Sequence, residues 1–141
     1  MANTVCTSFK EELMSGTQNL ANGGDTFKLA LYNSSSTINS AATTIYTVVN
    51  EVGNSGTYAA GGGTLANQAV TTDGTTAICN FDDLEFTSAT ITARYALIYN
   101  SSESNAAVCV LDFSTDQIST AGTFKIDFPA SGASTSIIRV A

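Results

Sequence analysis

The chain has 141 residues and a formal net charge of -7, with only five Lys or Arg. So few cations do not favour binding to nucleic acid or to an anionic membrane surface. The absence of His removes the imidazole base of Ser-His-Asp and Cys-His arrangements, as well as imidazole metal sites. The length fits one domain with a sizeable core.

Three cysteines, Cys6, Cys79 and Cys109, are widely spaced and form no Cys-x-x-Cys pair. A zinc site is therefore not expected, and the pattern predicts buried thiols in a reducing compartment. We expect no cofactor. The first residues lack a basic region followed by an apolar run, so no secretory signal is expected. No segment reaches the ~18 apolar residues of a spanning helix.

A short helix is predicted at the start of the chain. Ser8 and Glu11 have the spacing of a capping box, and Gly16 supplies a stop. Phe9 and Leu13 would share one side, with Met14 adjacent. A helix of roughly two turns is unstable alone, so it must dock on its own domain or on a partner.

From Asp25 onward the apolar residues recur with the period of two that is typical of strands. The predicted strands are "TFKLALY" (26–32), "GTLANQAV" (63–70), "TTAICNF" (75–81), "SATITARYALIY" (88–99), "AAVCVLDF" (106–113), "GTFKIDF" (122–128) and "SIIRV" (136–140). Turns are predicted at Asp73-Gly74, at Gly122 and around Pro129.

Two stretches interrupt this pattern. Residues 37–52 fit helical and extended spacing equally, so we predict a long irregular connection with a short strand or helical turn. The stretch "GNSGTYAAGGGT" (53–64) has five glycines around Tyr58, but no Lys-Ser/Thr follows as in a phosphate-binding loop. It is predicted to be a flexible surface loop.

These elements predict an all-β protein, a single jelly-roll or β-sandwich of about eight strands with a short N-terminal helix. Residues 1–24 would form an N-terminal arm, and residues 25–141 the β-domain.

The segment "ATITARYALIYN" (89–100) places one of the few cations within a strand. Its odd positions form a continuous apolar face, so Arg94 lies on the other face with Ala96 and Ile98. That face ends apolar and is expected to be covered. A covered guanidinium requires a carboxylate, and we predict a structural pair between Arg94 and Glu51, with Asp112 as the alternative.

Acidic residues gather in "NFDDLEF", which contains Asp82, Asp83 and Glu85. Paired carboxylates could act in a glycosidase or bind a hard cation, but the spacing is not that of an EF-hand. Asp82 and Asp83 would point to opposite sides of an extended chain. A solvated turn is favoured, and we expect no catalytic residues, no metal site and no enzymatic activity.

In four stretches the sequence resembles the capsid cement, or decoration, proteins of short-tailed bacteriophages. The matching words are "SFKEELMSGTQN" followed by "DTFKLALY", then "TVVNEVGNSGTYAAGGGTL", "ATITARYALIYN" and the ending "GTFKIDFPASGASTSIIRVA". They occur in order from Ser8 to Ala141. The chain departs from the family pattern in lacking a His near "SGTQN" and in carrying Tyr95 where a small residue is frequent.

The resemblance implies a jelly-roll virion protein, made in the bacterial cytoplasm, that ties major capsid proteins together on the outside of the shell as a homodimer. An alternative is a receptor-binding or fibre-tip domain in which Tyr58 and the glycine-rich loop meet a surface glycan. A third is a carbohydrate-active enzyme using Asp82, Asp83 or Glu85. Candidate partner-interface residues lie on the helix, in the glycine-rich loop and on the strand face beside Arg94: Phe9, Leu13, Met14, Tyr58, Ala96 and Ile98.

Overall fold

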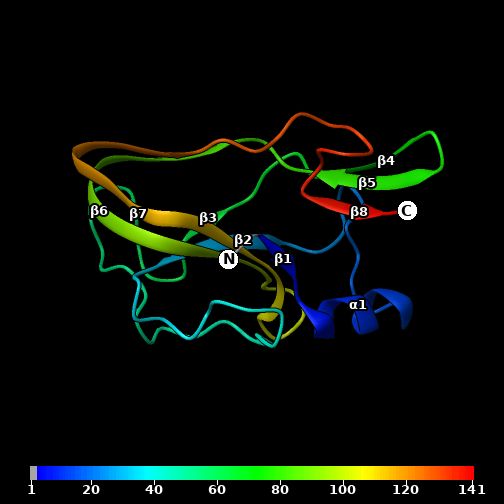
Figure 1. Cartoon of the computed structure of the whole chain (residues 1–141), viewed down its shortest axis with the longest axis horizontal. Coiled ribbons are helices and arrows are strands. Elements are labelled where there is room, and N and C mark those ends of the chain that lie inside the picture. The colour runs from blue at the N-terminus through cyan, green and yellow to red at the C-terminus, as the bar shows by residue number, and fades with distance from the viewer. Residues whose placement is uncertain (1–2) are drawn as a thin grey trace.

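The computed structural model describes residues 3–141 (Figure 1). Its elements are β1 (Thr4–Val5), α1 (Thr7–Met14), β2 (Phe27–Tyr32), β3 (Gly63–Thr64), β4 (Ala69–Asp73), β5 (Thr76–Asn80), β6 (Leu84–Asn100), β7 (Ala106–Ile126) and β8 (Ile138–Val140). They form two antiparallel sheets, with strand orders β1-β7-β6-β2-β3 and β4-β5-β8. This mostly-β arrangement is consistent with the predicted all-β sandwich.

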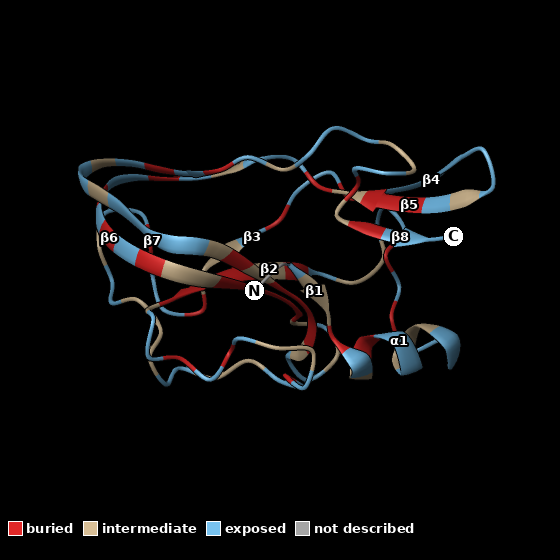
Figure 2. Ribbon diagram, in the orientation of Figure 1, coloured by how far each residue is buried: buried red, intermediate tan, exposed pale blue. Residues whose placement is uncertain are grey.

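The centre of the larger sheet is the pairing of β2 with the second half of β6. Phe27 lies opposite Asn100 and Tyr32 lies opposite Tyr95 in one uninterrupted register. Both faces are buried here, since five residues of β2 and Leu97 have no exposed surface. Figure 2 shows this buried inner region of the sheet. The irregular connection and the helix on one side, and the folded-back strands on the other, account for burial of both faces.

The strands β6 and β7 form one long ribbon that bends back over the sheet (Figure 1). Their pairing runs from Leu84 opposite Ile126 to Asn100 opposite Ala106, with four register shifts. Such bulges bend a strand and increase its twist. The predicted turn at Gly122 is therefore wrong, because β7 continues through it, and Gly122 lies opposite Ala89 at one of these irregular places.

The smaller sheet contains the hairpin predicted at Asp73-Gly74. Asp73 lies opposite Thr76, which leaves a two-residue loop. Gly74 has φ +60°, a value that glycine adopts without steric cost. The prediction of a hairpin here is confirmed.

The helix α1 starts earlier than predicted. Its N-cap is Cys6 rather than Ser8, and no side chain caps it. The capping-box prediction is wrong because Ser8 already lies in the first turn. The predicted stop is confirmed, since Gly16 has φ +81° and Thr17 N–H donates to the Glu12 carbonyl. Among residues 3–141, no helix is long and apolar enough to cross a membrane.

Residues 3–24 pack on the same core as the strands, through the buried side chains of Cys6, Phe9 and Leu20. A buried polar contact adds to this. Asn100, which has no exposed surface, donates from its side-chain amide to Gln18 Oε1 at 2.7 Å and to Asp25 Oδ2 at 2.8 Å. Both bonds satisfy a polar group that would be costly to bury unpaired.

All three cysteines are buried and unpaired by disulfides, as predicted for the thiols. Burial raises the pKa of Cys6 and of Cys79 to about 11. Burial also raises the pKa of Cys109. The thiols are therefore kept neutral and serve as small apolar groups.

Candidate functional site

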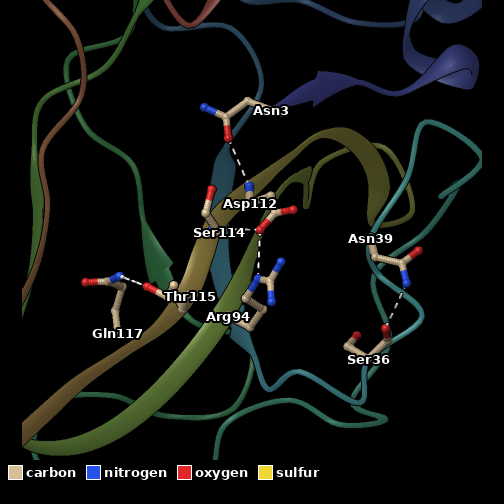
Figure 3. Close-up of polar contacts among 8 residues, drawn as sticks. All are labelled: Asn3, Ser36, Asn39, Arg94, Asp112, Ser114, Thr115 and Gln117. Carbon is tan, nitrogen blue, oxygen red and sulfur yellow. Dashed lines mark hydrogen bonds and ion pairs between the residues drawn. The ribbon is translucent and has the colours of Figure 1, made fainter. Parts of the chain in front are cut away.

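Arg94 pairs with Asp112 on the neighbouring strand β7, not with Glu51 (Figure 3). Arg94 Nε donates to Asp112 Oδ1 at 2.9 Å, and the Asp112 side chain is only 1% exposed. The guanidinium also lies 5.2 Å from the centre of the Tyr95 ring. The Arg94 hydrogen bond, aided by the Ser114 N–H, holds the pKa of Asp112 well below its usual range.

The strand order explains why the Glu51 pairing was wrong. Glu51 bridges to Tyr32 on the outer side of β2, so β2 separates it from β6. Adjacent strands lie about 4.8 Å apart. Asp112 on β7 lies opposite Tyr95, the residue that follows Arg94 on β6. Asp112 was the alternative that the sequence left open. The pairing register of β6 with β7 shifts between Ala93 and Tyr95, so the strand is irregular at Arg94.

Glu51 instead lies at the centre of a cluster of tyrosines. Its Oε2 accepts a hydrogen bond from the Tyr46 hydroxyl at 2.6 Å. Its Oε1 accepts from the Tyr58 hydroxyl at 2.8 Å and from Gly61 N–H at 2.7 Å. The Tyr99 hydroxyl, in turn, donates to the Gly61 carbonyl at 2.6 Å. One carboxylate therefore joins the irregular connection to the glycine-rich loop.

Burial dominates the electrostatics of these tyrosines. Burial, and then the Glu51 charge, raise the pKa of Tyr99 to about 12. The same two causes raise the pKa of Tyr32, and burial is the largest cause of the raised pKa of Tyr58. All three phenols therefore remain neutral donors near pH 7. The Tyr46 and Tyr58 hydroxyls donate to the Glu51 carboxylate, and the Tyr32 and Tyr99 hydroxyls donate to backbone carbonyls.

The glycine-rich loop packs against the sheet and is not the flexible surface loop predicted from sequence. At Gly62, which has φ +78°, an added Cβ would lie 1.8 Å from the Leu29 carbonyl oxygen. Tyr58 is only 1% exposed, and its hydroxyl accepts Leu31 N–H at 2.8 Å. The prediction that Tyr58 contacts a partner or a glycan is therefore wrong, because both its ring and its hydroxyl are used internally.

Most of the other predicted interface residues are also internal. Phe9 is 1% exposed, and Ala96 and Ile98 have no exposed surface. Their proposed partner-facing role is wrong, because the chain itself covers the face of β6 on which Ala96 and Ile98 lie. Leu13 is half-buried against the core. Met14 is 90% exposed and stays a candidate.

The acidic cluster is tied into local structure. Asp82 accepts a hydrogen bond from the Asn67 side chain. Asp83 accepts Phe128 N–H at 2.8 Å and pairs with Lys125. The Phe128 N–H, with Lys125 adding to it, lowers the pKa of Asp83. Among the described residues, no group of three or more Cys, Asp or Glu side chains has the arrangement of a metal site.

An apolar surface that sequence reasoning missed lies on the irregular connection between β2 and β3. Ile45, Val48 and Val49 are 53%, 65% and 61% exposed. A shallow hollow of about 290 Å³ adjoins Ile45, and it is lined by Ser, Thr, Ala and Ile side chains between Thr37 and Thr47. Three exposed branched apolar side chains within five residues make this segment a candidate contact surface.

Hydrogen bonds to the body of the protein hold this connection in place. Ala107 N–H donates to the Thr44 carbonyl, and Tyr46 N–H donates to the Asn105 carbonyl, both at 3.0 Å. The Tyr32 hydroxyl donates to the Thr47 carbonyl at 2.7 Å. The backbone is irregular but fixed, so the apolar side chains are presented in a set geometry.

A larger cleft of about 740 Å³ lies between β1, β7 and residues 135–139. Aromatic side chains such as Phe113, Phe124 and Phe128 line it, and Ile118 at its border is 69% exposed. Its charged groups have partners: Lys125 pairs with Asp127, Asp112 pairs with Arg94, and Arg139 donates a hydrogen bond to the Ala133 carbonyl.

Comparisons with known protein families, with curated proteins and with solved structures find no match to this chain.

Proposed function

We propose that this protein is a structural component of a tailed-phage virion, a decoration protein that binds the outside of the shell and stabilises contacts between major capsid proteins. The proposal combines the sequence resemblance with a surface suited to binding protein. It includes the jelly-roll topology, a homodimer, synthesis in the bacterial cytoplasm and a final place on the capsid surface. It assigns no enzymatic activity.

The observation that carries the proposal is the exposed group Ile45, Val48 and Val49 on a fixed connection. Burying such side chains contributes about 25 cal/mol per Å² of apolar area removed from water. A preformed surface also loses little conformational entropy on binding. Repetition of one modest contact over a symmetric shell then sums to strong stabilisation of the assembled state.

The polar groups support a structural role in the same way. The Glu51 carboxylate holds the glycine-rich loop through Tyr58. The Asp112 carboxylate joins β7 to β6 through Arg94. The hydroxyls nearest to a carboxylate are tyrosine donors with a raised pKa. Such groups rigidify a scaffold and do not supply a nucleophile.

Copy number tests the proposal directly. Particles of the phage that encodes this chain would be purified, and the chain quantified against the major capsid protein by mass spectrometry. On the order of hundreds of copies per particle are expected for a shell component. A few copies would favour the receptor-binding or fibre-tip alternative, and absence from the particle would overturn the proposal.

A further inference from the structure

Ionised side chains are nearly absent from one long stretch of the chain. Between Lys28 and Asp73 the sequence contains a single charged residue, Glu51. The Glu51 carboxylate accepts hydrogen bonds from the hydroxyls of Tyr46 and Tyr58 and from Gly61 N–H. We call the exposed side chains of residues 33–50 and 53–60 the neutral surface. Glu103 lies at the border of the neutral surface, in a turn whose Asn105 carbonyl accepts a hydrogen bond from Tyr46 N–H.

Acidic residues are concentrated elsewhere. Lys125 pairs with Asp83 and Asp127 and lies opposite Glu85, and Asp82 is next to Asp83 in the chain. These residues lie where β6 begins and β7 ends, along the top of Figure 1, whereas residues 33–50 form its lower edge. We call the surface around these residues the acidic side and the neutral surface the neutral side. The helix α1, which carries Lys10, Glu11 and Glu12, borders the neutral side, since Thr7 N–H donates to the Ala41 carbonyl.

The two sides differ in how readily they can be covered. Burying a carboxylate without a partner is costly, whereas burying Ile, Val and Ala side chains is favourable, and a Ser or Thr hydroxyl costs far less than a charge. The exposed apolar residues Ile45, Val48 and Val49 lie on the neutral side, beside an uncharged hollow. Charge, apolar exposure and fixed backbone geometry thus coincide on one surface.

We infer that the neutral surface is the face that docks on the shell, and that it meets a patch of the major capsid protein which is also free of unpaired charge. This inference rests on the proposed function and adds the contact surface and its orientation. An apposed charge on the partner would be desolvated without a counterion, so charge matching requires a neutral patch. A second copy of this chain is the competing occupant of this surface, and the self-association measurement below distinguishes it from the shell.

This orientation has a consequence for the particle. With the neutral surface against the shell, the acidic side faces solvent. Each bound copy then adds negative charge to the outside of the particle. Like charges on adjacent particles oppose aggregation.

The test uses purified shells of the phage that encodes the chain and four forms of the full-length protein. Val48→Asp/Val49→Asp places two charges on the neutral surface. Ile118→Asp makes the same change at the cleft, which is the competing surface. Val140→Asp is the matched control, since Val140 is 53% exposed on β8. Circular dichroism and thermal melting verify that every form is folded, and cosedimentation measures binding.

The inference predicts that Val48→Asp/Val49→Asp weakens binding at least about tenfold, while Ile118→Asp and Val140→Asp bind as the unchanged protein does. Decorated shells should also migrate faster toward the anode than bare shells. Loss of binding in Ile118→Asp alone would overturn the inference and leave the proposed function standing. Self-association that only Val48→Asp/Val49→Asp abolishes, seen by analytical ultracentrifugation, would overturn it in favour of a second copy. Failure of the unchanged protein to bind shells would count against the proposed function itself.

Discussion

Tyr58 donates a hydrogen bond from its hydroxyl to the carboxylate of Glu51 at 2.8 Å, and the same hydroxyl accepts Leu31 N–H at 2.8 Å. This relationship joins three parts of the molecule: the glycine-rich loop, the irregular connection and the central strand β2. It explains how a segment with almost no regular secondary structure keeps Val48 and Val49 in a fixed position. The contact surface therefore depends on a buried polar cluster behind it.

Removal of the carboxylate should destabilise the fold. Glu51→Ala leaves the hydroxyls of Tyr46 and Tyr58 and the amide of Gly61 without their acceptor, and we expect a loss of about 2–4 kcal/mol in the free energy of unfolding. Glu51→Gln keeps one carbonyl oxygen and should lose less. Urea denaturation of the three proteins measures the difference. Equal stability of Glu51→Ala and the unchanged protein would show that the cluster contributes nothing.

Gly62 should tolerate no side chain. A Cβ there would lie 1.8 Å from the Leu29 carbonyl oxygen, so Gly62→Ala must displace backbone, and we expect a loss of about 3 kcal/mol or more. Gly74→Ala is the control, because Gly74 also has a positive φ but has no atom within 4 Å of the added Cβ. Its loss should be about 1–2 kcal/mol. Similar melting temperatures for the two variants would contradict the close packing of the loop.

Arg94 and Asp112 should behave as a coupled pair. Arg94→Ala and Asp112→Ala each lower stability, and the double variant should lose less than the two single losses added together, since they share one interaction. The matched cycle with Arg94→Ala and Glu51→Ala should be close to additive, because β2 separates these residues. Non-additivity in the second cycle, but not in the first, would restore the Glu51 pairing.

The same pair predicts how stability depends on acid. Because the Arg94 hydrogen bond lowers the pKa of Asp112 in the folded state, the carboxylate contributes stability above the pKa of an unfolded Asp, near 3.8. That contribution is lost as the pH falls toward the lower, folded-state pKa. The stability advantage of the unchanged protein over Asp112→Asn should therefore shrink between about pH 5 and pH 2. An advantage that stays constant over this range would contradict the assignment.

Alkaline solution should unfold the tyrosine cluster. The folded state raises the pKa of Tyr99 to about 12 and also raises the pKa of Tyr32 and Tyr58. Unfolded phenols ionise near pH 10, so stability is complete below about pH 10 and decreases as the pH rises toward 12. Tyrosinate absorbance from these side chains should appear together with the loss of the β-sheet signal in circular dichroism. Their ionisation near pH 10 in a folded protein would contradict the burial.

Most strands were predictable because their apolar residues alternate, but the strand predicted at residues 63–70 divides into β3 (Gly63–Thr64) and β4, which begins at Ala69. The helix stop and the Asp73-Gly74 hairpin follow from glycine conformation. Alternation did not predict that β7 runs through Gly122, because bulges let a ribbon bend without a turn. The capping-box spacing placed the start of the helix at the wrong residue, since the N-cap is Cys6 and Ser8 lies in the first turn.

The side-chain contacts of the candidate site were harder to predict from the sequence than the strands were. Long-range position, not residue type, decides that Arg94 meets Asp112 and that Tyr58 turns inward. One signal was present, since Glu51 is the sole charged residue between Lys28 and Asp73. An isolated carboxylate among tyrosines and glycines indicates a half-buried hydrogen-bond acceptor, as Glu51 is. The exposure of Ile45, Val48 and Val49 follows from that arrangement, which no local pattern encodes.

A reconstruction of the virion by electron cryomicroscopy tests the central claim most directly. We predict density that fits this chain on the outer surface of the shell, repeated with the capsid symmetry, with residues 33–50 against the major capsid protein and the start of β6 facing solvent. Density for the chain at the tail alone, or no density for it on the particle, would contradict the account.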